Sequence, residues 1–262
     1  MAGKYKVKIG WSNNELVNHL RAGNGRIESK VVITPTRDLS SLSAKIARDI
    51  RLDSSTINQY LNNSKNWERY NFNQENRLCL FIPNTYFVDW DITNEEFLKR
   101  MKLEYDKFWD KKRRQMVKNI GLTPNEVQTL ASIVYWETKK DKDMPTVAGV
   151  YMNRIKLGIP LQADPTLIFA HNDYKIKRVL NVHKNIDSPY NTYKNKGLPP
   201  GPILIAPIKY VDAVLNYEKH DYLFFVAKED FSGYSYFSKT NAEHEKYANK
   251  YRKALDERNV KK

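Results

Sequence analysis

The chain has 262 residues, enough for one large domain or two modest ones, and its 41% hydrophobic and 12% aromatic composition excludes an intrinsically disordered protein. Its formal net charge of +14 favours polyanionic partners such as nucleic acid, anionic lipid or an anionic cell-wall polymer. The single cysteine, Cys79, cannot form an internal disulfide and is interpreted as a small buried hydrophobic residue.

Several kinds of site have no signature in the sequence. We find no zinc-finger spacing, RNP motif, P-loop or G-x-S-x-G elbow. The histidines are far apart and none has the spacing of a metal site: His19, His171, His183, His220 and His244. We therefore expect no metal. No stretch approaches the roughly 18 to 20 apolar residues of a membrane span.

The first part of the chain predicts short strands and helices in alternation. The expected elements are a strand at 5–9, a helix at 12–21 ended by Gly23, a strand at 31–33, helices at 39–49 and 54–61, and a strand at 78–82. Strand, helix, helix and strand between about 27 and 87 make a small α+β module. Such a module leaves little room for a catalytic pocket.

A long charged helix is expected next. Thr93 and Glu96 form a capping-box pattern, and the helix is predicted to run to about residue 119. Its length and charge suggest a connector between two domains. We expect an N-terminal region at 1–117 and a second domain at 118–262. The basic run at 111–114 is most simply a solvated helix face.

An acidic residue lies on the apolar face of the following helix, expected at 123–140. Thr123 and Glu126 again form a capping box. The buried face recurs at Val127, Leu130, Ala131 and Val134, and the next position on it is Glu137. Burial disfavours the charged carboxylate, so its pKa should rise and it could act as a general acid. The alternative is a buried Glu paired with an Arg or a backbone donor.

A second helix is predicted from Pro145 to Gly158, with the small residues Ala148 and Gly149 allowing another helix to pack closely. Asn153 lies on the same side as Gly149, and it is either a structural hydrogen-bonding residue or a substrate contact. The segment LQADPT follows, in which Asp164 precedes a proline. Asp164 is either a turn carboxylate or part of a site.

Residues 187–207 contain five prolines and two glycines and predict a long irregular segment. Tyr190, Asn191 and Tyr193 are side chains suited to contact sugar rings, so we expect an ordered groove wall. The alternative is a rigid cover over the core. A strand at 222–227, a hairpin partner at 234–237 and a charged helix from Asn241 complete the expected α+β fold.

Five segments, in this order, resemble the YceG-like or MltG family of endolytic murein transglycosylases: ASIVYWET, VAGVYMNRIKLGIPLQADPT, SPYNTYKNKGLPPGPI, YLFFVA and YFSKTNAEH. The resemblance covers about 120–255. IESKVVITP, the helix pair after it and FIPNTY resemble the family's LysM-like module more weakly. The family usually has E-x-E in the first motif. Here Tyr135 replaces the first Glu, which points to Glu137 as the catalyst.

The resemblance implies cleavage of the MurNAc-GlcNAc β-1,4 bond of peptidoglycan without water, giving 1,6-anhydroMurNAc ends. One carboxyl, Glu137, would act first as acid and then as base, with no metal or organic cofactor. The residues expected to position glycan are Asn153, Gln162, Asp164, Tyr190, Asn191, Thr192, Tyr193, Ser238, Thr240 and Glu243.

The resemblance also implies where the protein acts and with what. The expected partners are peptidoglycan strands and cell-wall synthesis enzymes, with no nucleic acid. The family is usually attached to the inner membrane by one N-terminal transmembrane helix. This chain shows no such helix, so we expect it to be the periplasmic region.

Two other functions remain open. The first is a muramidase-type hydrolase on the same scaffold, with Asp164 as the second carboxylate. The second is a non-catalytic protein that binds cell wall or nucleic acid, suggested by the net charge and the LysM-like half.

Overall fold

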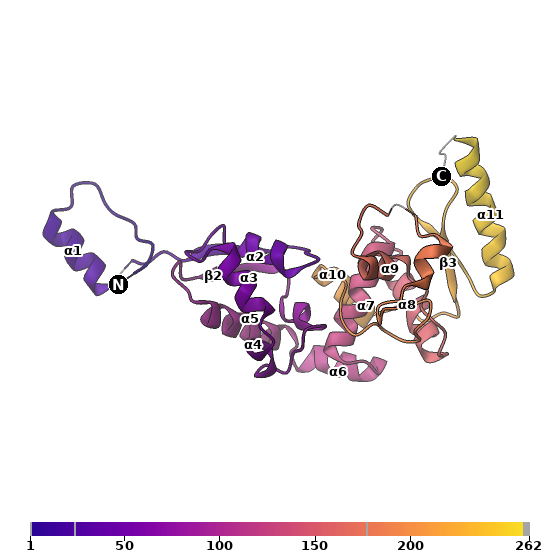
Figure 1. The fold of residues 1–262 in the computed structure, drawn as a ribbon, viewed down its shortest axis with the longest axis horizontal. Helices are drawn as coiled ribbons and strands as arrows, with labels where there is room; N and C mark the ends of the chain where they lie inside the picture. The colour runs from indigo at the N-terminus through magenta and orange to yellow at the C-terminus, as the bar shows by residue number, and fades with distance from the viewer. Residues whose placement is uncertain (1, 24, 177, 259–262) are drawn as a thin grey trace. The chain divides into compact units, whose positions relative to one another are not determined.

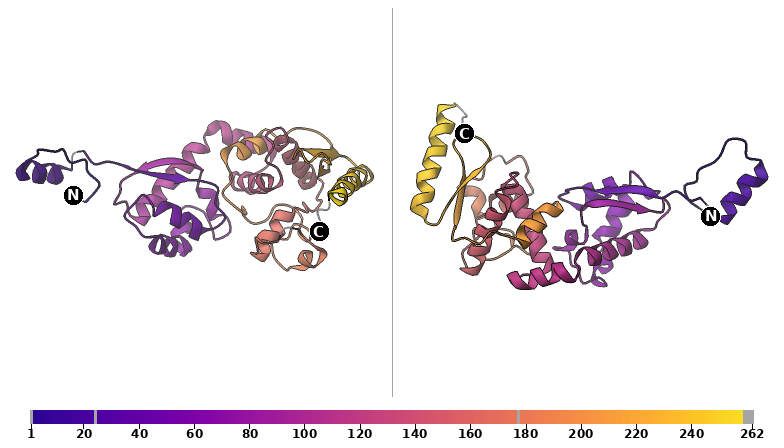
Figure 2. Two further views of the ribbon diagram at one scale, coloured as in Figure 1. Left: turned by 90° about the horizontal axis from the view of Figure 1, so that it is seen from above. Right: turned by 180° about the vertical axis from the view of Figure 1, so that it is seen from behind.

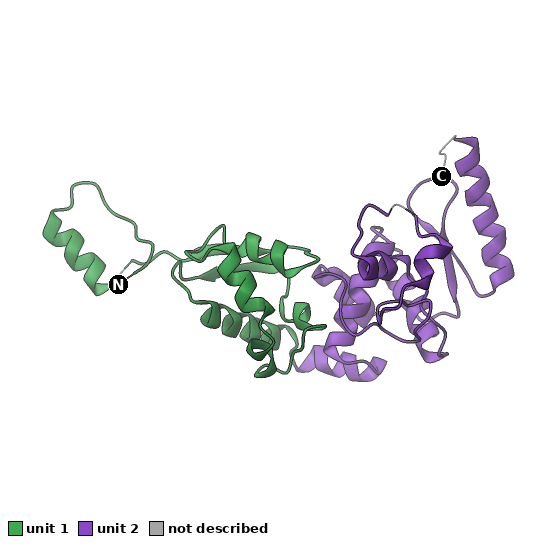
Figure 3. Cartoon of the chain, in the orientation of Figure 1, with its two compact units in different colours: residues 1–110 green, residues 111–262 purple. Residues whose placement is uncertain are grey.

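The computed structural model describes residues 2–23, 25–176 and 178–258. The chain divides into two compact units, unit 1 (Met1–Asp110) and unit 2 (Lys111–Lys262), which are coloured separately in Figure 3. Helices combine with a two-stranded antiparallel sheet in each unit. The expected α+β class is therefore confirmed.

Unit 1 is built around strands β1 (Ser29–Ile33) and β2 (Asn84–Val88) (Figure 1). The two strands pair antiparallel, with Val31 opposite Tyr86. Its helical elements are α1 (Asn13–Ala22), α2 (Leu39–Ile46), α3 (Ser54–Asn62), α4 (Lys65–Glu68), η1 (Arg77–Leu80) and α5 (Asn94–Phe108). Alternation along β1 buries Ser29, Val31 and Ile33, and α2 packs on β1 and on α3. The sheet thus has one face in the core.

Two expected strands of unit 1 are wrong. Residues 77–80 form the 3₁₀ helix η1, and the strand begins later, at Asn84. The run Leu78–Ile82 is buried throughout, so it has no alternation to distinguish a strand from a helix. Residues 5–9 form only an isolated bridge between Tyr5 and Arg26, because among the described residues no strand pairs with them.

The expected long helix is also wrong, because it is two helices. Helix α5 ends before Trp109, and α6 (Lys111–Ile120) follows. Trp109 has a non-helical backbone and a fully buried ring. The helical backbone therefore ends at a residue whose ring is packed in the core, and the boundary between the units follows at Asp110.

Unit 2 combines packed helices with a β-hairpin. Helix α7 (Pro124–Glu137) packs on α8 (Met144–Lys156), and α10 (Ile208–Leu215) packs on both. Strands β3 (Phe224–Ala227) and β4 (Ser235–Ser238) pair as predicted, and α11 (Asn241–Glu257) lies along them (Figure 2). Helix α9 (Asp164–His171) and η2 (Asn181–Asn185) precede the irregular segment at 187–207, which contains no helix or strand.

Helix α8 lies very close to the chain that leads into β3. A Cβ atom on Gly149 would lie 2.4 Å from the Glu218 carbonyl oxygen and 2.5 Å from the His220 ring. The close neighbour of Gly149 is thus the segment at 218–220, which is not part of a helix, so the expected helix partner is wrong at this position. The segment is tied to α8 by the Glu218 amide, which donates to the Pro145 carbonyl at 3.1 Å. Only glycine permits this approach. It fixes β3 beside α8.

Candidate active site

A pocket of about 560 Å³ lies in unit 2, a volume typical of small-ligand sites. Residues from α7, α8, the 161–164 turn, the proline-rich segment, β3 and α11 line it. They include Glu137, Tyr151, Arg154, Gln162, Asp164, Lys184, Tyr193, Phe224, Phe225 and His244. Segments that are distant in sequence therefore meet around one carboxyl group.

Glu137 is the last residue of α7, because Thr138 leaves the helical conformation. The residues before it on the same face, Val127, Leu130 and Val134, are fully buried, whereas Glu137 is partly exposed to the pocket. Burial, and to a smaller extent the negative charge of Asp164, raise the pKa of Glu137, which is about 7. A carboxyl of this pKa is partly protonated at neutral pH and can donate a proton.

Two residues of α8 oppose this rise of the Glu137 pKa. The buried Tyr151 hydroxyl donates a hydrogen bond to Glu137 Oε1 at 2.7 Å and stabilises the charged form. The positive charge of Arg154 acts in the same direction. Tyr151 and Arg154 are three residues apart, so both reach the pocket from one face of α8.

Arg154 is held in place by backbone carbonyls. Its Nε donates to Leu223 O at 2.7 Å, and its Nη1 donates to Leu161 O at 2.8 Å and Pro160 O at 3.2 Å. Burial lowers its pKa. Among the described residues no carboxylate lies within 4.0 Å of its nitrogen atoms. Its guanidinium therefore brings a positive charge to the pocket and fixes the 160–162 turn against β3.

The LQADPT turn brings Asp164 to the pocket. Gln162 has a left-handed backbone (φ 54°), and both Gln162 and Asp164 are exposed. The Tyr193 hydroxyl donates to Asp164 Oδ1, and both this bond and burial raise the pKa of Tyr193. The Lys184 amine lies 4.8 Å from the Tyr193 ring centre. Tyr193 thus joins the proline-rich segment to the turn.

The neighbours of Tyr193 in the proline-rich segment are fixed by hydrogen bonds and ring packing. Asn191 is fully buried, and its Nδ2 donates to Lys184 O at 2.9 Å and Ile186 O at 2.8 Å. Thr192 is buried and accepts the Ala163 amide at 3.0 Å. Tyr190 packs on Phe169, with ring centres 4.6 Å apart. Of the four expected contacts in this segment, Tyr193 lines the pocket, whereas the other three lie outside its lining.

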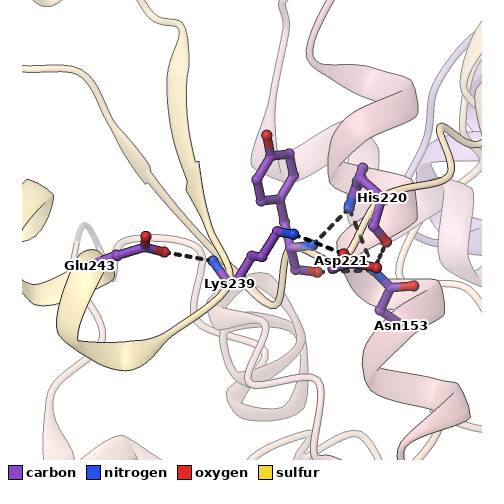
Figure 4. Close-up of polar contacts among 6 residues, drawn as sticks. Asn153, His220, Asp221, Lys239 and Glu243 are labelled. Atoms are coloured by element: carbon purple, nitrogen blue, oxygen red, sulfur yellow. Dashed lines mark hydrogen bonds and ion pairs between the residues drawn. The ribbon is translucent and has the colours of Figure 1, made fainter.

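Asn153 does not line the pocket, and its side chain belongs to a chain of polar contacts (Figure 4). Its Nδ2 donates to His220 O at 2.7 Å and to Tyr222 O at 3.0 Å. On the other side, Lys239 pairs with Asp221 at 2.8 Å and its amide donates to Glu243 at 3.1 Å. These contacts connect α8 to both ends of the hairpin.

The last motif lies at the start of α11. Thr240 is the N-cap residue, and its side chain accepts the Glu243 amide at 3.2 Å. Ser238 is buried opposite Phe224 in the hairpin. Ser238, Thr240 and Glu243 lie outside the pocket lining, whereas Asn241, His244 and Glu245 of the same segment line it.

Comparison with known proteins decides the family. The model of the YceG-like family matches residues 1–250. The chain belongs to the YceG-like family. It is 33% identical over 98% of its length to an endolytic murein transglycosylase of Bacillus subtilis, of which it covers 74%. It is 32% identical over 63% of its length to the endolytic murein transglycosylase of Streptococcus pneumoniae serotype 2, of which it covers 30%.

A solved structure agrees with the family assignment. The crystal structure of a YceG-like protein of Listeria monocytogenes is similar at a TM-score of 0.69 and 26% identity. The similarity covers 93% of this chain and 84% of that one. The fold of this YceG-like chain thus has an experimental counterpart.

The Tyr135 substitution lies away from the pocket of this YceG-like chain. Positions 135 and 137 differ by about 200° around a helix, so they face different sides. The Tyr135 ring packs on Tyr210 of α10 at 5.0 Å, with Lys139 above it. Tyr135 is not among the residues that line the pocket.

Sequence reasoning named four of the thirteen residues that line the pocket and missed nine, among them Tyr151, Arg154, Lys184 and His244. Tyr151 and Arg154 lie within the quoted VAGVYMNR segment, where their i, i+3 spacing could have indicated a shared face. His244 ends the quoted YFSKTNAEH segment, so the resemblance could have indicated it. Lys184 had no signal, because only the tertiary fold brings η2 to the pocket. Among the described residues no group of three or more His, Cys, Asp or Glu side chains is arranged to hold a metal ion.

Proposed function

We propose that this chain is an endolytic murein transglycosylase that cleaves the MurNAc-GlcNAc β-1,4 bond of peptidoglycan and leaves 1,6-anhydroMurNAc ends. The observation that supports it best is Glu137, a carboxyl with a pKa of about 7 that opens onto a pocket. Membership of the YceG-like family and two relatives named for this activity support it independently.

Glu137 performs the first step as a general acid. Its protonated carboxyl donates to the glycosidic oxygen while positive charge develops at C1 of the muramic sugar, and the bond to the leaving sugar breaks. The pKa near 7 suits this role, because the group is still largely protonated just below neutral pH.

The second step returns the proton to Glu137. The carboxylate takes the proton of the muramic C6 hydroxyl, whose oxygen attacks C1 and closes the 1,6-anhydro ring. Tyr151 stabilises the carboxylate through its hydrogen bond at 2.7 Å and keeps it oriented between the two steps. Gln162, Asp164 and Tyr193 line the same pocket and position the glycan.

Product analysis tests this proposal. Purified peptidoglycan is digested with the chain and the fragments are analysed by mass spectrometry. We expect muropeptides that lack the mass of one water at the new end, which is the signature of an anhydro ring. Fragments with only reducing ends, or no fragments from a folded protein, would contradict the proposal.

A muramidase-type hydrolysis is the second candidate. Asp164 lines the same pocket as Glu137 and influences its pKa, so a second carboxylate is available to assist water. This activity gives reducing ends in the same mass spectra. Asp164→Asn would then abolish cleavage, whereas a transglycosylase that uses Asp164 only for positioning keeps part of its rate and its anhydro product.

We also propose a division of labour between the units. Unit 1, whose segment at 27–87 resembles a LysM-like module, binds or orients wall material, and unit 2 carries out the chemistry. A fragment that begins at Lys111 keeps α6, whose Arg113 pairs with Asp212 at 3.0 Å within unit 2. Circular dichroism shows whether the fragment folds. A folded fragment should retain cleavage of peptidoglycan and bind long glycan strands more weakly than the whole chain.

The place of action follows from the proposed substrate. We propose that the chain acts on the outer side of the cytoplasmic membrane, attached there as the resemblance implies, and meets cell-wall synthesis enzymes at the same polymer. No helix among the described residues combines the length and apolar character needed to cross a bilayer. Fractionation of cells that express the natural protein, with protease added from outside, tests this placement.

A further inference from the structure

A second pocket, of about 780 Å³, adjoins the first in unit 2. Asp164 and His244 line both pockets, so the second begins where the first ends. It continues between α9, β3 and the C-terminal half of α11. A ligand whose reacting bond lies at Glu137 can therefore extend a branch into it.

The second pocket differs chemically from the first. Its apolar surface comes from three elements, with Ile168 on α9, Val226 on β3, and Ala248 and Leu255 on α11. A chain of sugar hydroxyls does not need this much apolar contact. The surface suits a ligand with methyl or methylene groups.

Charged groups surround this apolar surface. Arg178 and Arg252 supply positive charge, and Asp256 supplies a negative charge. Arg252 is held on α11 by Glu245 Oε2 at 3.1 Å and Asn249 Oδ1 at 2.6 Å, so its guanidinium is positioned before any ligand arrives. Guanidinium groups bind carboxylates with directed hydrogen bonds. The ligand should thus carry carboxylates and an amino group as well as small apolar groups.

We propose that the second pocket binds the stem peptide attached to the muramic sugar beside the cleaved bond, an inference that rests on the proposed glycan cleavage. The lactyl group carries this peptide away from the glycan, with alanine methyls, free carboxylates and an amino group. The methyls contact Ile168, Val226 and Ala248, and the carboxylates face Arg252. The enzyme therefore prefers glycan strands that carry peptides.

The first arm of the test compares two polymers. One is peptidoglycan strands with their peptides, and the other is the same strands after an amidase has removed them. We expect kcat/KM to be about tenfold higher with peptides, corresponding to about 1.4 kcal/mol. Arg252→Ala should lower this preference severalfold. Lys253→Ala, the matched control, removes the same charge from the next residue of α11, which does not line the pocket, and should keep the preference.

The second arm measures binding without cleavage. A synthetic alanyl-γ-glutamyl-lysyl-alanine tetrapeptide is titrated into the wild-type chain while amide NMR signals are followed. We expect shifts at Val226 and Ala248, and a weaker Kd in Arg252→Ala but not in Lys253→Ala. Absence of such shifts, or equal kcat/KM for both polymers, would overturn the inference. Loss of cleavage of both polymers with the shifts retained would count against the proposed function alone.

Discussion

The two units place similar carboxyl groups in opposite environments. Glu96 of unit 1 lies in the first turn of α5, exposed, and accepts the Thr93 amide at 2.9 Å, which lowers its pKa. Glu137 of unit 2 lies at the end of α7, where burial raises its pKa to about 7. Amide groups at a helix start favour a negative charge, whereas burial beside a helix end disfavours it. Position therefore makes one glutamate a helix cap and gives the other the raised pKa that suits the general acid we propose.

The largest expected effect comes from removing the acid of unit 2. Glu137→Gln keeps the shape of the side chain but cannot donate and then accept a proton, so cleavage of peptidoglycan should fall by about 10³-fold or more. Release of anhydro ends is the measurement, with circular dichroism as the check of folding. A folded variant that keeps more than a few per cent of the rate would remove Glu137 from the mechanism.

The next effect compares a buried and an exposed asparagine. Asn191 of unit 2 is fully buried and donates to two carbonyls, so Asn191→Ala should lower the free energy of unfolding by about 2 to 3 kcal/mol. Asn73 of unit 1 is exposed and accepts the Asn76 amide at 2.9 Å, so Asn73→Ala should cost less. Urea unfolding measures both. An Asn191→Ala chain of normal stability that fails to cleave glycan would instead make Asn191 a substrate contact.

The third prediction compares one tyrosine of each unit by the pH dependence of kcat/KM. Tyr151→Phe removes the hydrogen bond that favours the Glu137 carboxylate, so the pKa of Glu137 should rise and the alkaline fall of kcat/KM should move to higher pH. We expect roughly tenfold slower cleavage at neutral pH, since the carboxylate of the second step is less stable. Tyr86→Phe in unit 1, where the hydroxyl donates to Ile82 O at 2.5 Å, should lower stability and leave the profile in place. Equal profiles for wild type and Tyr151→Phe would contradict the assigned role.

The smallest effect is expected at the cap of unit 1. Glu96→Gln keeps a capping side chain but loses the charge, so the free energy of unfolding should change by about 0.5 kcal/mol or less. Cleavage per folded molecule should not change. Thermal unfolding and the peptidoglycan assay measure the two quantities, and a clear loss of cleavage would show that Glu96 does more than cap α5.

The sequence correctly predicted the elements whose formation depends on residues close together in the chain. The capping boxes at Thr93 and Thr123 and the hairpin at β3 and β4 depend on neighbouring residues, and they lie where predicted. The failures depend on tertiary contacts. The expected long helix ends at Trp109, whose ring is buried in the core, and the run at 78–82 is buried throughout, which hides its period.

The site residues could likewise be predicted only where the signal lies within one segment of the sequence. The periodic apolar face of α7 predicted Glu137, because a helix period is visible in one segment. Lys184 and His244 reach the pocket from η2 and α11, and no local pattern connects those segments to α7. Asn191 has the residue type of a sugar contact, but its amide is used by the Lys184 and Ile186 carbonyls. Residue type alone could not distinguish these two uses.

The most direct test of the account is the pKa of the Glu137 carboxyl itself. It can be measured by ¹³C NMR titration, with the signal assigned by its absence in Glu137→Gln, and compared with the pH dependence of kcat/KM. Because the raised pKa belongs to the protonated acid of the first step, we predict titration near pH 7 and a kcat/KM that falls as pH rises through that value. Titration near the ordinary value of 4.5, with kcat/KM unchanged up to pH 8, would contradict the account.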